Sequence, residues 1–157
     1  MKTIENVPFD EIFVGQTCEH RKTVTEKDIL LFAIVSGDSN PVHVDESYAK
    51  TTQFGERIAH GMYTSALVSA AMATDLPGPG SVYLTQSMKY KQPVKVGDTL
   101  TIRIEVIKKR AGKNFVTFST LVTNQHGDRV LLGEAMARVA SEKIVLPASE
   151  LPPLNLG

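Results

Sequence analysis

The run from Ile58 to Leu76 most constrains the fold, because it is long, rich in small residues and almost uncharged. Its apolar residues lie nearly all round a helix, a pattern typical of a buried helix. Its 19 residues approach the length of a membrane span, but polar residues are scattered along it. Pro77-Gly78-Pro79-Gly80 then ends the helix. Burial inside a folded sheet is therefore the better account.

Most of the chain after this helix has the pattern of strands. Residues 98–109 show it best, with apolar and polar residues alternating over their length. The other expected strands are 15–24, 81–92, 114–124 and 129–140. The fold class is thus predicted to be α+β, with an antiparallel sheet of about five strands wrapped around a long central helix. A single sheet leaves edge strands open, so we expect a homodimer or larger homo-oligomer.

Two shorter helices are expected before the long one. Thr25-x-x-Asp28 has the form of a capping box, and Gly37 is a typical residue to end that helix. Asp45 is expected to cap a short helix over 46–50. With a lead-in at 1–14 and a proline-rich tail at 147–157, residues 1–157 fit a single domain.

Composition excludes several classes of function. Positive and negative residues balance at 17 each, so nothing indicates a nucleic acid or an anionic membrane surface as partner. The N-terminus lacks the apolar core of a signal peptide. The one cysteine excludes an intrachain disulfide and fits a reducing compartment. We expect a cytoplasmic protein.

The polar stretch from 36 to 43 carries the candidate chemistry. Asp38, Asn40 and His43 place a carboxylate, a carboxamide and an imidazole within six residues. Pro41 pushes Asn40 away from helical dihedrals, so we expect a non-helical segment whose side chains can converge. The second stretch of interest, 57–62, begins the long helix and supplies backbone N–H groups.

These two stretches resemble the MaoC-like family of R-specific enoyl-CoA hydratases. The similarity rests on Asp-Ser-Asn-Pro-Val-His at 38–43 and Ile-Ala-His-Gly-Met at 58–62, and runs over roughly 17–139. The resemblance implies one hot-dog domain acting as a dimer. It also implies a hydro-lyase that reversibly hydrates trans-2-enoyl-CoA to the R-3-hydroxyacyl-CoA. No metal or redox cofactor is implied; coenzyme A enters as part of the acyl-CoA substrate.

The resemblance also assigns roles to individual residues. It places the catalytic pair on Asp38 and His43, the supporting amide on Asn40, and the thioester-binding backbone N–H on Gly61. Expected near the substrate are Ser69, His60 and Met62.

Hydration suits these residue types. An acid and a base holding one water can deliver it to the β carbon and a proton to the α carbon, worth about 10²–10⁴ in rate. A backbone N–H at the helix start can meet the charge that builds on the thioester oxygen. A side chain at Gly61 would obstruct the close approach of the substrate.

Other interpretations of these residues stay open. Asp38 could instead form an Asx turn, and His60 could be structural. Asp38, His43 and His60 could form a metal triad, although no ligand pair has helical spacing. Rival functions are a hot-dog acyl-CoA thioesterase, which would want a carboxylate on the long helix, and a non-catalytic acyl-thioester-binding module.

Overall fold

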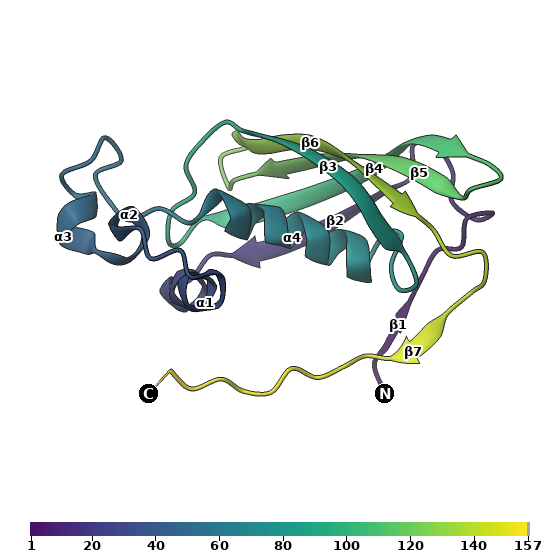
Figure 1. Ribbon diagram of the computed structural model, residues 1–157, viewed down its shortest axis with the longest axis horizontal. Coiled ribbons are helices and arrows are strands. Elements are labelled where there is room, and N and C mark those ends of the chain that lie inside the picture. The colour runs from purple at the N-terminus through teal and green to yellow at the C-terminus, as the bar shows by residue number, and fades with distance from the viewer. Residues whose placement is uncertain (157) are drawn as a thin grey trace.

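A curved antiparallel sheet covers one side of helix α4 in the computed structural model, which describes residues 1–156 (Figure 1). The five strands, in their order across the sheet, are β2 (Thr17–Thr23), β4 (Thr99–Arg110), β5 (Phe115–Thr123), β6 (Arg129–Arg138) and β3 (Val82–Tyr90). The predicted sheet is confirmed. Strands β4, β5 and β6 follow one another as a meander. Strand β3 pairs with β6 instead of with β4, the next strand in sequence, and its other edge has no partner strand among the described residues.

The alternation in the sequence of β4 sets the face that packs. Ile102, Ile104 and Val106 are fully buried, while Arg103 and Ile107 are exposed. In β5 alternate residues are buried in the same way over the whole strand. Side chains of successive strand residues point to opposite faces, so β4 and β5 each contribute one apolar face to the core beneath α4.

Helix α4 (Gly61–Thr74) is shorter and less covered than its composition predicts. Ile58 and Ala59 are extended and pair with the chain at Lys95 and Val94, which delays the helix to residue 61. Residues facing the sheet, such as Val68, are buried, but the opposite side leaves its residues exposed. A single protomer therefore leaves one side of the helix uncovered. None of the described helices has the length and hydropathy that a bilayer span requires.

Helix α1 (Glu26–Ser36) begins and ends as predicted. The Thr25 hydroxyl accepts from the Asp28 N–H, and the Asp28 carboxylate accepts from the Thr25 N–H. Gly37, at φ 78°, ends the helix in the left-handed conformation that glycine adopts without strain. Both helix ends therefore follow from local sequence.

The polar stretch after α1 departs from expectation in one respect. Residues 38–40 are irregular as predicted, but Pro41–Val44 form a one-turn helix, α2, followed by α3 (Glu46–Ala49). The prediction of a wholly non-helical segment is wrong because proline is well tolerated at the first position of a helix. His43 consequently sits on a helical turn.

The termini form a small sheet that the sequence did not indicate. Strands β1 (Thr3–Glu5) and β7 (Val145–Pro147) pair antiparallel, so the lead-in is partly regular. Beyond β7 the tail runs back extended below α4 towards α1, where the Lys27 ammonium donates to the Leu154 carbonyl (Figure 1). Gly157, the last residue of the predicted tail, lies outside the described residues.

Candidate active site

Asp38, His43 and His60 converge in the structure. One ligand-type atom from each lies within 4.8 Å of the others. Asp38 lies in the irregular loop after α1, His43 lies on α2, and His60 directly precedes α4. The two stretches singled out in the sequence therefore meet in space.

The carboxylate of Asp38 has two different environments. Its Oδ1 accepts a hydrogen bond from the Asn40 N–H at 3.2 Å, which is an Asx turn. Its Oδ2 lies 4.0 Å from Nε2 of His43, and the side chain is 50% exposed. The Asx turn and the catalytic role are therefore compatible, because each uses a different oxygen.

The tautomer of His43 follows from its backbone contact. Nδ1 lies 2.8 Å from the Ile58 carbonyl oxygen, which can only accept, so Nδ1 carries the proton. In the neutral ring Nε2 is then an acceptor, and it faces the carboxylate of Asp38. The ring is buried, so its orientation is fixed by packing as well as by this bond. Two acceptors about 4 Å apart leave room for a water that donates one hydrogen bond to each.

His60 packs against both of these residues. Its Nε2–H donates to the Asp38 carbonyl at 2.9 Å, and its ring stacks on His43 with centroids 3.8 Å apart and an interplanar angle of 28°. Stacked rings direct their in-plane lone pairs side by side, whereas zinc ligands converge tetrahedrally on one ion. The trio is thus better arranged for proton transfer than for metal ligation.

The side chain of Asn40 is engaged at α2. Its Oδ1 accepts from the Val42 N–H at 3.2 Å, making Asn40 the N-cap of the helix that carries His43. The resemblance predicts that Asn40 supports the catalytic pair. In the structure its backbone N–H orients the Asp38 carboxylate, while its side chain starts the turn that presents His43.

Gly61 is the first residue of α4, where helix N–H groups have no partner within the helix and the dipole is positive. A Cβ built on Gly61 would lie 3.0 Å from Cε1 of Tyr90. The missing side chain therefore also makes room for the Tyr90 ring, a contact that nothing in the sequence indicated. Tyr90 in turn bonds Ser65, with its hydroxyl 2.6 Å from the Ser65 Oγ.

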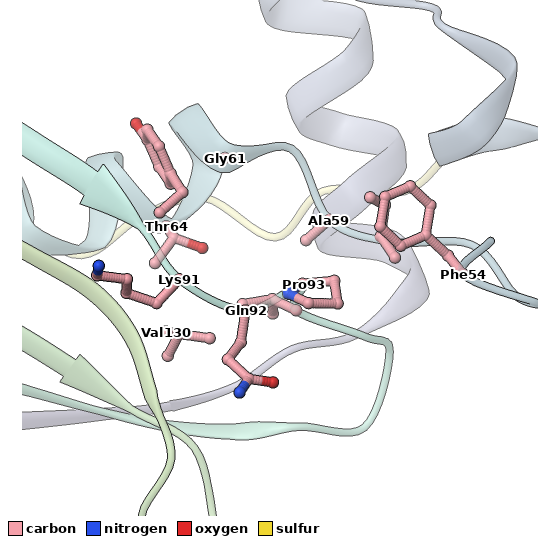
Figure 2. A pocket seen from close by; sticks show the side chains of 11 residues that line it. Phe54, Ala59, Gly61, Thr64, Lys91, Gln92, Pro93 and Val130 are labelled. Carbon is pink, nitrogen blue, oxygen red and sulfur yellow. The ribbon is translucent and has the colours of Figure 1, made fainter. Parts of the chain in front are cut away.

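Two hollows flank this end of α4. Gly61, Thr64, Lys91 and Val130 are among the residues around a cavity of about 320 Å³, with Phe54 at the opposite end from Lys91 (Figure 2). An open groove of about 680 Å³ runs along α4 and is lined by Met62, Ser69 and Tyr90, among others. Met62 and Ser69, both expected near substrate, thus share one groove. Asp38 and His43 line neither hollow.

The remaining contacts of the site carry no local sequence signal. The Ile58 carbonyl fixes the His43 tautomer, and the Phe32 ring lies 4.9 Å from that of His60. Both residues look like ordinary apolar positions in the sequence. Only their placement across the fold makes them part of the site.

The sequence of this chain is similar to those of several known proteins. The family model described as MaoC like domain matches residues 12–127. A relative from Rhodospirillum rubrum named (R)-specific enoyl-CoA hydratase is 48% identical over 131 residues, covering 83% of this chain and 90% of its own. A 3-hydroxybutyryl-CoA dehydratase from Methylorubrum extorquens is 39% identical over 140 residues, covering 86% and 85%.

Solved structures are similar over the same region and beyond. The unliganded R-hydratase PhaJ1 from Pseudomonas aeruginosa superposes with a TM-score of 0.95 at 49% identity, covering 99% of this chain and all of that one. An (R)-hydratase from A. caviae, described as involved in PHA biosynthesis, gives a TM-score of 0.79 at 38% identity, covering 82% and 97%.

Proposed function

The chain belongs to the MaoC-like domain family, and on that premise we propose that it is an (R)-specific enoyl-CoA hydratase. It is a hydro-lyase that adds water reversibly to trans-2-enoyl-CoA thioesters and so forms R-3-hydroxyacyl-CoA. Its relatives are named for hydration in one case and for dehydration in the other, which are the two directions of a single equilibrium. The hot-dog fold and the chemistry therefore point the same way.

One observation carries the assignment of roles. Oδ2 of Asp38 and Nε2 of His43 face each other across 4.0 Å, and both are hydrogen-bond acceptors when Asp38 is ionised and His43 is neutral. A water between them would donate one hydrogen bond to each acceptor. One lone pair on the water oxygen would remain free. That lone pair is what attacks the β carbon of the enoyl thioester.

The proton balance closes within the pair. The water oxygen bonds to the β carbon, and the pair takes up one water proton. The pair then delivers a proton to the α carbon, which converts the enolate back to the thioester. Because the two groups bind the same water, both take part in the transfer of its proton.

The start of α4 supplies the complementary charge. While the water adds, negative charge moves onto the thioester oxygen, and a preorganised N–H donor there is worth about 10²–10³ in rate. Gly61 begins α4 directly after His60, the residue that contacts both Asp38 and His43. We assign the Gly61 N–H to this oxygen, with Met62 and Ser69 lining the adjacent groove for the acyl part.

The thioesterase alternative lacks its nucleophile or base. On this fold it would use a carboxylate on α4, and no residue of Gly61–Thr74 is acidic. The polar residues of α4 are hydroxyls, and Ser65 and Thr74 donate to carbonyls one turn earlier. Water addition therefore fits the described residues better than acyl transfer.

We propose that the enzyme is a homodimer joined along β3. This strand lies at one edge of the sheet, and its outer side is unpaired within the protomer. Exposed apolar side chains gather on it, including Val82, Tyr83 and Leu84. An open, apolar edge of this kind pairs readily with another strand, and a second copy of β3 would cover it and the bare side of α4. Light scattering after size-exclusion chromatography tests this directly.

Two further expectations complete the proposal. We expect no redox cofactor, because addition of water to a conjugated thioester involves no net oxidation or reduction, and no metal, because Asp38 and His43 supply both proton-transfer groups. The single cysteine fits the cytoplasm better than an oxidising compartment.

The decisive experiment mixes the protein with crotonyl-CoA. The absorbance of the enoyl group should fall, chiral analysis should find the R-3-hydroxy product, and a free-thiol assay should stay silent. Thiol release without hydration would indicate the thioesterase instead. Silence in both assays, with crotonyl-CoA still bound, would indicate a binding module.

A further inference from the structure

The loop that carries Asp38 has few anchors. Among the described residues, almost all hydrogen bonds of residues 38–40 join positions close in sequence. Examples run from the Asp38 N–H to the Ser36 Oγ and from the Ser39 N–H to the Gly37 carbonyl. The bond from Nε2–H of His60 to the Asp38 carbonyl is different, because it crosses 22 residues of sequence. It ties an otherwise self-contained, exposed loop to the start of α4.

His60 is built into the core around this bond. It is 2% exposed, it stacks on His43, and the tilted ring of Phe32 lies 4.9 Å from it. The two aromatic neighbours hold the plane of the ring, and the bond from Nε2–H fixes its orientation within that plane. The Asp38 carbonyl accepts that N–H, and the ring that supplies it also forms one wall of the His43 site.

The other ring nitrogen of His60 indicates that stability is not the reason for a histidine here. Nδ1 is buried and has no hydrogen-bond partner among the described residues. Since Nε2 donates to a carbonyl, Nδ1 is an unpaired acceptor in the neutral ring. Buried polar atoms without partners are scarce because they are costly. An apolar side chain would pack here without that cost, but it could not hold Asp38.

We propose that His60 is a positioning residue, which holds the Asp38 loop and the His43 ring at the separation that one water can bridge. This inference rests on the proposed hydratase function. His60 acts through Asp38 and His43 and does not itself touch the reacting atoms. It also links the pair to the oxyanion site, because the next residue is Gly61.

A matched pair of variants tests the role. In His60→Gln the side chain keeps an N–H near the position of Nε2, whereas His60→Leu has similar bulk and no donor. Both lose the aromatic ring, so the difference between them reports the hydrogen bond. We expect kcat for crotonyl-CoA to fall about 10- to 100-fold in His60→Leu with KM little changed, since small misplacements cost that much. His60→Gln should recover most of this loss.

Stability and loop order separate positioning from a merely structural role. His60→Leu should melt at or above the wild-type temperature, while ¹⁵N relaxation should show the Ser39 and Asn40 amides more mobile than in His60→Gln. Equal kcat in the two variants, or a fall in kcat that tracks a loss of melting temperature, would overturn the proposal. If wild type fails to hydrate crotonyl-CoA, the hydratase assignment fails, but relaxation still decides whether His60 holds the loop. If His60→Leu does not fold, His60→Gln decides the question. A loop as ordered as in wild type, together with turnover near that of wild type, supports the proposal. A mobile loop in His60→Gln refutes it.

Discussion

Oδ2 of Asp38 lies 4.0 Å from Nε2 of His43, and each group is held by a backbone bond on its other side. The Asn40 N–H holds Oδ1 of Asp38, and the Ile58 carbonyl holds Nδ1 of His43. The gap is thus fixed from both sides at a width that suits one water.

Asp38→Asn should abolish hydration without unfolding the protein. The amide keeps the Asx-turn acceptor but removes the negative charge that takes part in proton transfer, so kcat should fall about 10²- to 10⁴-fold. Because the side chain is exposed, the free energy of unfolding should change by less than about 0.5 kcal/mol. Steady-state kinetics with crotonyl-CoA and urea unfolding measure the two effects. Near-normal turnover would remove Asp38 from the mechanism.

Asn40→Ser and Asn40→Ala should differ in activity. Serine caps a helix about as well as asparagine, whereas alanine loses about 1 kcal/mol of capping. If the side chain serves to start α2 and present His43, Asn40→Ser should stay within a few-fold of wild-type kcat and Asn40→Ala should be clearly slower. Equal losses in the two variants would show instead that the carboxamide N–H group is needed, because both variants lack it.

Gly61→Ala should lose activity and keep its stability. The new Cβ would lie 3.0 Å from the Tyr90 ring, which is 49% exposed and can move aside. Loss of access to the helix N–H should lower kcat about 10²- to 10³-fold. The double variant Gly61→Ala with Tyr90→Ala is the control, since it removes the crowding. Restored activity in the double variant would attribute the loss to a displaced Tyr90 rather than to blocked substrate.

Cys18 should react slowly with thiol reagents in the folded protein. Burial on β2, aided by the nearby charge of Asp75, raises the pKa of its thiol to about 11. The thiolate is the reactive form, so little of it is present near neutral pH. Alkylation by iodoacetamide at pH 8 should be far slower in native than in urea-unfolded protein. Equal alkylation rates would contradict the burial of Cys18. If Cys18 reacts slowly in the native protein, a free-thiol assay during turnover reports only released coenzyme A.

Asp28→Asn should destabilise the protein at neutral pH and have less effect in acid. Burial of Asp28 opposes its ionisation, but bonds from Thr25 and Lys22 outweigh this and lower the pKa of the carboxyl. A lowered folded pKa contributes stability above the unfolded value, and that stability is lost as pH falls through the folded value. Melting temperatures of wild type and Asp28→Asn should therefore converge as the pH is lowered below about 4. A gap that is constant with pH would contradict this.

Local sequence predicted the elements whose causes are local. The capping box at Thr25 and Asp28, the glycine stop at Gly37 and the alternation of 98–109 each involve residues a few positions apart. The start of α4 was misplaced because Ile58 and Ala59 pair with residues far along the chain. The β1–β7 pair was missed for the same reason, since its strands lie at opposite ends of the sequence.

The sequence alone determined the chemical types at the site, since the pattern of Asp38, Asn40 and His43 before a glycine-led helix is short and local. Tertiary structure decided which atom does what. In the folded protein, Oδ1 of Asp38 accepts a hydrogen bond within the turn, and Oδ2 faces His43. The Ile58 carbonyl fixes the His43 tautomer, and the buried ring of His60 lies against both Asp38 and His43. Side-chain identity follows from the sequence. Hydrogen-bond direction and the distances between site atoms arise only when distant segments pack against one another.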